Sequence, residues 1–213
     1  MAASAQKKYK TTGWEVINSL ATYSDTFATT SPSVKLRFSA FLHFDTRYHF
    51  DFGKHTGMYT GYAVRNVGFS VKYNDTLSKK FRVYTLGIPV AFKIGNMESR
   101  KFFFAGAEAE LALNYKEKTF IDKDKKKFNE WFSSRTQLFM PSVFAGVQLN
   151  KGFNIIAKYY LTGFFNKDFK YKGVNPYGAI DAQLFYIALS YNTKAKKGAL
   201  KKRAEKTPTI TRL

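Results

Sequence analysis

The chain contains long runs in which apolar and polar side chains alternate residue by residue. In residues 34–52 the even positions are almost all apolar, and the odd positions carry nearly all of the charge. Successive side chains of a β-strand point to opposite faces, so this run predicts a single strand with one apolar face. Its length is several times the five or six residues typical of strands in soluble proteins.

The same alternation recurs along the chain and predicts eight strands. We expect them at residues 14–23, 34–52, 57–73, 81–94, 102–115, 137–149, 153–164 and 180–191. Near Asn66 the apolar positions change from even to odd, which predicts a β-bulge there. In the segment 102–115 the odd positions up to Tyr115 form the apolar face, opposite Glu108 and Glu110.

The links between these strands alternate in length. Short links are expected at 53–56, 95–100 and 150–152, and longer ones at 24–33, 74–80, 116–136 and 166–179. Outer-membrane barrels have short periplasmic turns and long external loops, and an even strand number places both termini on one side. The pattern therefore predicts an all-β fold, namely an eight-stranded antiparallel up-and-down transmembrane β-barrel with both termini periplasmic.

Periodicity alone does not say which face of each strand is wet. A soluble lipocalin-like barrel would turn its apolar face inward to a ligand, whereas a membrane barrel turns it outward to lipid. The face opposite the apolar one is rich in small polar residues with occasional charges, which favours a narrow and filled lumen. In such a lumen acidic and basic side chains must meet. We expect a polar network of Arg37, Arg65, Lys93, Glu108, Glu110 and Lys158.

Composition changes this interpretation little. Aromatic residues make up 18%, cysteine is absent, and no window reaches the roughly 18 to 20 apolar residues of a transmembrane helix. A formal charge of +20 invites a nucleic-acid-binding interpretation. The charge is densest in KEKTFIDKDKKKFNE (116–130) and after Asn192, outside the expected strands, so we expect no nucleic-acid partner.

Several runs are similar to the small outer-membrane β-barrel proteins of Bacteroidetes-type bacteria. The similarity spans Val34 to Asn192 and is carried by TLGIPVAFKIGN (85–96), FFFAGAEAELALNYKEKTF (102–120), MPSVFAGVQLNKGFNIIAKYYLTGFFNKDF (140–169) and LFYIALSYN (184–192). The resemblance implies a multi-pass location in a Gram-negative outer membrane and insertion by the barrel-assembly machinery. The terminal recognition signal of that machinery would be formed by Phe185, Ile187, Leu189 and Tyr191.

Two groups of side chains are candidates for chemical sites. A metal site from His43, Asp45, His49 and Asp51 is disfavoured, because residues two apart on a strand are separated by nearly 7 Å and Arg47 lies among them. A catalytic pair of Glu108 and Glu110 is disfavoured relative to a lumen salt-bridge network. We expect no enzyme activity, no metal and no cofactor.

The ends of the chain are expected to lie outside the barrel. Residues 1–10 form an N-terminal extension whose MAASAQKK start has the small residues of a signal-peptide remnant, residues 11–192 the barrel, and residues 193–213 a basic periplasmic tail. Candidate partner contacts are Trp131, Phe132, Lys201, Lys202 and Arg203. The basic link 116–136 is a candidate for contact with lipopolysaccharide phosphates.

These features predict a non-enzymatic structural or accessory subunit of a larger outer-membrane complex for assembly, secretion or transport. Its partners would be outer-membrane lipid, lipopolysaccharide and other proteins. One alternative is a narrow channel for small solutes or ions. Another is a soluble lipocalin-like or nucleic-acid-binding barrel.

Overall fold

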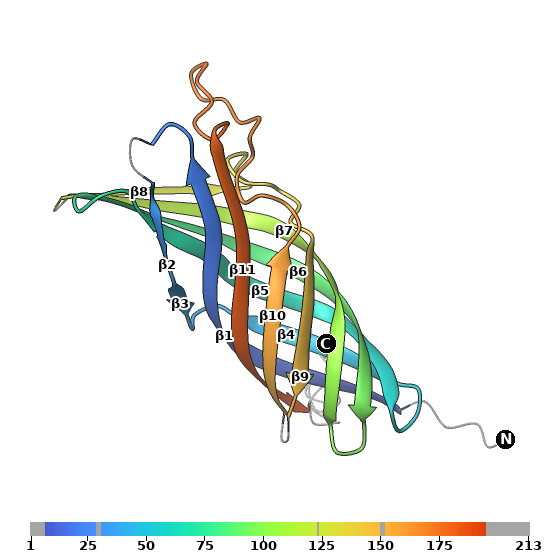
Figure 1. Ribbon diagram of the computed structural model, residues 1–213. Helices are drawn as coiled ribbons and strands as arrows, with labels where there is room; N and C mark the ends of the chain where they lie inside the picture. Colours follow the sequence, from blue (N-terminus) through green and yellow to red (C-terminus); the bar gives the residue numbers. More distant parts are fainter. Residues whose placement is uncertain (1–6, 29–30, 123, 150–151, 195–213) are drawn as a thin grey trace, which may run out of the picture.

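A computed structural model describes residues 7–28, 31–122, 124–149 and 152–194. This part of the chain is built from antiparallel strands (Figure 1). Their bounds are β1 Lys7–Asp25, β2 Ser33–Lys35, β3 Arg37–Ser39, β4 Phe44–Asp51, β5 Thr56–Lys72, β6 Leu77–Asn96, β7 Lys101–Ile121, β8 Asp124–Trp131, β9 Ser142–Gln148, β10 Phe153–Tyr160 and β11 Ile180–Lys194. Within the described ranges, no helix is long and apolar enough to cross a membrane.

Eight of these strands form a closed ring. Their order around the ring is β1, β4, β5, β6, β7, β9, β10 and β11, and β11 returns to pair with β1 from Thr11↔Lys194 to Asp25↔Ile180. Every pairing is antiparallel and joins neighbours along the ring. The prediction of an eight-stranded antiparallel barrel is confirmed.

Both described ends of the chain lie at the end of the barrel that carries the short turns. Lys7 pairs with Asp51, just before the turn into β5, and Lys194 pairs with Thr11 on β1. β1 thus begins inside the segment 1–10 that was expected to precede the barrel, and β11 continues two residues past Asn192.

The prediction of one continuous strand over residues 34–52 is wrong. The chain forms β2, β3 and β4, with Leu42 in the left-handed region at φ 60°. β3 pairs with β1, whereas β2 pairs with β5. The alternation shifts by one residue between β2 and β3, because Lys35 and Leu36 are both exposed, whereas Val34 packs against the core and Arg37 is buried. In β3 and β4 the odd positions face the interior, as expected.

The prediction of a β-bulge near Asn66 is also wrong. β5 and β6 keep one register throughout, and the irregularity lies in β7, opposite Tyr84 and Thr85 of β6. As a result Tyr115, expected on the outward face, is buried inside. The apolar positions change parity at Asn66 because the interior of the barrel changes from polar to apolar, while the backbone of β5 continues without a shift.

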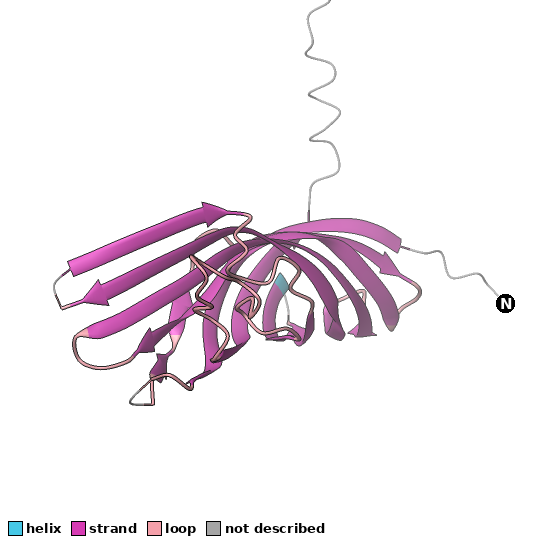
Figure 2. Ribbon diagram, turned by 90° about the horizontal axis from the view of Figure 1, so that it is seen from above, coloured by secondary structure: helices cyan, strands magenta, loops and turns pink. Residues whose placement is uncertain are grey.

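The link expected at 116–136 is largely a β-hairpin. β7 continues to Ile121 and β8 returns along it from Asp124 to Trp131. β6 and β7 contain 20 and 21 residues, about twice the 9 to 11 that a membrane-crossing strand needs. Their far ends therefore extend past the ring together with β8, to one side of it (Figures 1 and 2). We call this extension the outer sheet; it comprises residues 33–35, 66–72, 77–85, 113–121 and 124–131.

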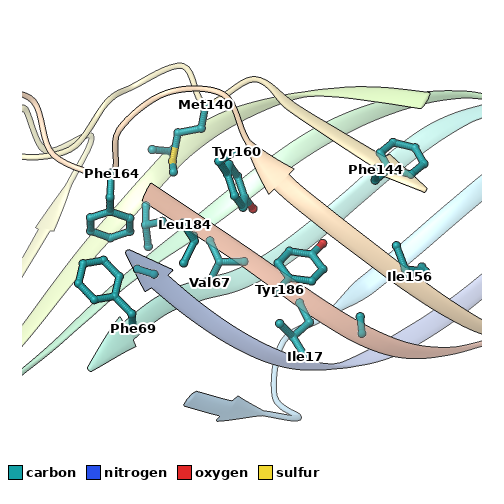
Figure 3. Packing of buried hydrophobic residues seen from close by; sticks show 14 of the residues in the cluster. Ile17, Val67, Phe69, Met140, Phe144, Ile156, Tyr160, Phe164, Leu184 and Tyr186 are labelled. Carbon is teal, nitrogen blue, oxygen red and sulfur yellow. The ribbon is translucent and has the colours of Figure 1, made fainter. Parts of the chain in front are cut away.

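Two expected strands are shorter than predicted. β9 begins at Ser142 instead of residue 137, and β10 ends at Tyr160 instead of residue 164. The connection 161–179 leaves the ring and returns over its outer end, where Phe164 lies beside Phe69 of β5 (Figure 3).

Candidate functional site

A cluster of charged side chains crosses the middle of the barrel interior. Arg65 on β5 donates from Nε to Oε2 of Glu15 on β1 at 2.8 Å, and its Nη1 pairs with Glu108 on β7. Lys158 on β10 donates to Oε2 of Glu108 at 2.6 Å and also pairs with Glu110. These side chains are all buried. The result is a continuous chain of ion pairs from β1 to β10.

Each carboxylate of this cluster has several donors. Glu110 accepts a hydrogen bond from Thr85 Oγ1 at 2.6 Å and one from the Tyr160 hydroxyl at 3.1 Å, in addition to Lys158. Removing a charge from water costs several kcal/mol unless partners replace the lost solvation. Saturation with donors is what allows acidic side chains to remain in the interior of a narrow barrel.

A second charged group lies nearer the short-turn end. Lys93 pairs with Oδ1 of Asp51 at 2.5 Å and approaches Nδ1 of His49 at 3.3 Å. The His49 ring stacks on Tyr9 with 4.4 Å between centroids, and its Nε2 lies 3.0 Å from Thr11 Oγ1. Lys93 thus belongs to the lumen without joining the central cluster.

Arg37 lies apart from both groups. Its Nη2 donates to Oδ1 of Asn66 at 2.8 Å, and His43 of the same chain segment contacts Ser39 Oγ at 2.8 Å. Of the six residues expected to form one polar network, the structure brings together four. These are Arg65, Glu108, Glu110 and Lys158.

The residues weighed as a metal site have separate partners. His43 lies by Ser39, Asp45 pairs with Arg47, and His49 and Asp51 meet Lys93. In the ranges that the structure describes, no group of three or more ligand-type side chains could hold a metal ion. The arrangement is a ladder of polar contacts along one strand face.

Sequence reasoning missed Glu15 as a member of the central cluster and did not assign Arg47 to the network. Arg47 pairs with Asp45 and reaches Glu15 at 3.6 Å. Glu15 is the only charged residue between Thr11 and Ser24. It also has opposite parity to the exposed Trp14, and that signal could have placed it in the lumen.

The middle of the lumen holds almost no free volume. A cavity of about 10 Å³ lies among the central charges, lined by residues that include Arg47, Tyr59, Glu108 and Lys158. That volume is about the minimum for a single water molecule. At this level the interior is filled by side chains, as expected for eight strands.

The outer end of the interior is filled differently, by an aromatic core. Phe69 and Phe81 from the strands pack against Phe164 and Phe165 from the connection 161–179, with centroids 5.0 to 5.3 Å apart. Tyr177 stacks on Phe165 at 4.6 Å. The connection therefore inserts side chains into the barrel mouth and closes it.

The outside of the ring is apolar. Exposed fractions reach 65% at Leu36, 58% at Ile88 and 57% at Ile187, all at outward positions of ring strands or of the β2–β3 segment. Exposed aromatic side chains lie close to the short turns, and these are Phe52, Phe92, Phe103 and Phe153. An apolar band bordered by aromatic residues is typical of membrane barrels.

The remaining predicted residues lie at the end of β8, on the ring strand β11, or outside the described ranges. Trp131 and Phe132 are exposed at the end of β8. The four residues expected to form the insertion signal all lie on β11, where Ile187 and Leu189 are exposed. Lys201, Lys202, Arg203 and residues 1–6 fall outside the described residues.

Comparison with known proteins gives only distant structural likenesses. No protein-family model matches the chain, and no curated protein sequence matches it. Ail, the attachment invasion locus protein of Yersinia pestis, is 14% identical with a TM-score of 0.40, over 87% of this chain and 99% of Ail. Neisserial surface protein A is 11% identical with a TM-score of 0.42, over 90% and 100% of the two chains. OprG from Pseudomonas aeruginosa is 12% identical with a TM-score of 0.38, over 88% and 97%.

Such low identities and TM-scores transfer no activity and no ligand to this chain. The assignment of an eight-stranded barrel depends on the pairing of its own strands, from β1 around the ring to β11.

Proposed function

We propose that the chain is an integral β-barrel of a Gram-negative outer membrane with a closed lumen. In this proposal it is a non-enzymatic structural or accessory subunit of a larger outer-membrane assembly, and it works through its extramembrane surfaces. The observation that carries the proposal is the polarity of the ring. Charged side chains such as Glu15 and Lys158 are buried inside, and apolar side chains such as Ile88 and Ile187 are exposed outside.

The exterior supports a membrane location. Soluble monomers rarely expose contiguous apolar patches larger than a few hundred Å², yet here successive outward positions of one strand are apolar and exposed. On β6 these are Leu86, Ile88, Val90, Phe92 and Ile94. A lipocalin-like barrel would require the opposite arrangement around its middle, with charges outside and an apolar cavity inside.

The interior argues against the narrow-channel alternative. An ion crossing the lumen would have to pass the linked pairs of Arg65 and Lys158 with Glu108, and then the aromatic core around Phe69. The only void described at the level of the charges has a volume of about 10 Å³. We therefore expect the barrel to be closed to small solutes.

The buried carboxylates support a non-enzymatic role. Glu108 is 3% exposed and is held by two cationic side chains, so it is neither accessible to a substrate nor free to exchange a proton. The outer sheet, in contrast, presents a broad surface beyond the ring. In this proposal the short-turn end, where the described ends Lys7 and Lys194 lie, faces the periplasm, and the barrel-assembly machinery inserts the chain.

Spin labels at Leu36, Val90 and Ile187 test the membrane location. In lipid vesicles we expect all three to be relaxed by oxygen, a lipid-soluble quencher, and a label at Lys127 on the outer sheet to respond to a water-soluble nickel chelate instead. Oxygen shielding at the first three positions would exclude the proposal and favour a water-borne barrel.

Conductance and co-purification test the role. In planar bilayers with 1 M KCl, the purified chain is expected to give no unitary conductance. The Debye length at this ionic strength is about 3 Å. Purification from native membranes in mild detergent is expected to retain partner proteins. Stable ion conductance would favour the channel alternative, and a chain that purifies alone from native membranes would contradict the subunit role.

A further inference from the structure

One face of the outer sheet carries a dense array of basic side chains. Cross-strand register places Lys80 on β6 opposite Lys118 on β7, and Lys118 opposite Lys127 on β8. The neighbouring row joins Arg82 to Lys116 in the same way. Directly opposed residues of adjacent strands share a face. Further bases on this outward face are Lys35, Lys72 and Lys125.

This basic face lacks acidic partners. Within the described residues, its strand positions carry no Asp or Glu, and of its bases only Lys72 forms an ion pair, with Asp75 of the adjacent turn. Glu117 and Glu130 point to the opposite face of the outer sheet, where Glu117 accepts a hydrogen bond from the Tyr115 hydroxyl at 2.9 Å. The face therefore retains a net positive charge.

Like charges directly opposite each other destabilise a sheet. Partial desolvation, with the added charges of Arg82, Lys125, Lys127 and Lys80, lowers the pKa of Lys118. Aromatic contacts offset part of this repulsion, because the Lys80 and Lys125 ammonium groups lie 5.3 and 5.6 Å from the Phe120 ring centroid. A bound anion would remove the remaining repulsion.

The basic face continues directly from the lipid-facing surface of the ring. Along the outward positions of β6, apolar side chains end at Leu86, Tyr84 follows, and Arg82 and Lys80 come next. On β8 the exposed Trp131 lies beside Asn114, whose other neighbour is Tyr84. Tyr and Trp are enriched where the hydrocarbon meets the headgroups. The bases thus begin at the level of the lipid headgroups.

We propose that this face binds the phosphate groups of an anionic outer-leaflet glycolipid. Adjacent strands are about 4.8 Å apart. Basic side chains on two or three neighbouring strands can therefore contact the same phosphate group. The continuity with the apolar band favours a lipid over a soluble polyanion, because acyl chains bound to the same molecule would lie against Leu86 and Ile88. The inference rests on the proposed membrane location.

The test compares two triple variants with the same loss of charge. Lys80→Gln/Lys118→Gln/Lys127→Gln removes one row of the basic face. Lys54→Gln/Lys101→Gln/Lys170→Gln removes three exposed lysines elsewhere on the molecule. Binding of bisphosphorylated lipid A, fully dephosphorylated lipid A and inorganic pyrophosphate to the full chain is measured by native mass spectrometry from a neutral detergent.

Each lysine near an anionic lipid surface contributes about fivefold to binding, so the outer-sheet variant should bind bisphosphorylated lipid A roughly a hundredfold more weakly. The control variant should bind it within about twofold of the parent chain, and dephosphorylated lipid A should bind all three chains equally weakly. Equal affinity of both triple variants for bisphosphorylated lipid A would overturn the proposal. Tight binding of dephosphorylated lipid A would do so as well, and binding of pyrophosphate as tight as that of lipid A would show that the lipid is not the ligand.

Failure of this proposal is distinguishable from failure of the membrane location. Oxygen accessibility of labels at Leu36, Val90 and Ile187 depends on the ring alone, whereas lipid A affinity depends on the outer sheet. A chain whose ring is in lipid but whose affinity is unaffected by the outer-sheet substitutions would retain the first proposal and lose the second.

Discussion

The two halves of β6 have opposite polarity. In the ring, Ile88 and Val90 face outward and Lys93 is buried inside; in the outer sheet, Lys80 and Arg82 face outward and Phe81 and Val83 are buried inside. In the ring half of β6 the apolar side chains face outward, which is the reverse of a soluble protein. In the outer-sheet half they face inward, as they do in a soluble protein. In the proposed membrane location, the surroundings of the strand therefore change from hydrocarbon to water between Leu86 and Arg82.

The interior follows the same division. Under the apolar band it is closed by ion pairs, which are directional and require each charge to have a partner. Under the outer sheet it is closed by aromatic packing between Phe69 and Phe164, which depends on shape and volume. Substitutions should therefore have different consequences in the two parts.

The largest effect is expected from Glu108→Leu in the ring. This substitution leaves Lys158 and Arg65 with fewer partners in a buried site, so the free energy of unfolding should fall by about 4 kcal/mol. Glu117→Leu in the outer sheet is the matched control and should cost less than about 1 kcal/mol, because Glu117 is only half-buried. Urea unfolding in lipid vesicles measures both, and equal losses would remove the distinction between the two parts.

Phe69→Ala should have a slightly smaller effect, a loss of about 3 kcal/mol, because it leaves a cavity between Phe81 and Phe164. The same change at Phe120, on the outward face of the outer sheet, should cost less than about 1 kcal/mol. Thermal unfolding of both variants in detergent provides the comparison. A larger loss at Phe120 would mean that the apolar side of the outer sheet has been assigned to the wrong face.

Exchanging polarity across the boundary on β6 should give an asymmetric result. Ile88→Arg places a charge in hydrocarbon and should cost about 2 to 3 kcal/mol of unfolding free energy in vesicles. Lys80→Ile, eight residues away at the same parity, should change it by less than about 0.5 kcal/mol. If both substitutions cost the same, the boundary does not lie between these residues.

The smallest effect is expected from Thr85→Val, which removes one hydrogen bond to the buried Glu110 carboxylate. Glu110 retains Tyr160 and Lys158, so the loss should be about 1 to 2 kcal/mol. Thr60→Val on the outward face of β5 is the matched control, with a change near zero or slightly stabilising. A loss at Thr60 as large as that at Thr85 would show that Thr60 does not face lipid.

The eight strands of the ring and the faces on which most of their side chains lie could be predicted from the sequence alone. Alternation over residues 81–94 and 180–191 placed Ile88 and Ile187 together with the other outward residues, because the two-residue period of a strand is a local property of the chain. The same parity placed Glu108, Glu110 and Lys158 inside. These assignments needed no knowledge of which strand lies beside which.

The outer sheet was not visible in the alternation. KEKTFIDKDKKKFNE (116–130) has charges at positions of both parities, because both faces of the β7–β8 hairpin meet water near its turn. A strand without a continuous apolar face has no periodic signal that distinguishes it from a loop. The switch of the apolar residues from even to odd positions at Asn66 was equally ambiguous. A β-bulge and a change of the barrel interior from polar to apolar leave the same pattern in the sequence.

Which charged side chains form pairs could not be predicted from the sequence, because it depends on the tertiary structure. The pairing of Arg65 with both Glu15 and Glu108 depends on the shear of the closed ring, which brings together residues 50 and 43 positions apart. Closure also decided that the connection 161–179 fills the mouth of the barrel. Local pattern fixes the face on which each side chain lies, whereas register and closure, which are set by many distant contacts at once, fix its neighbours.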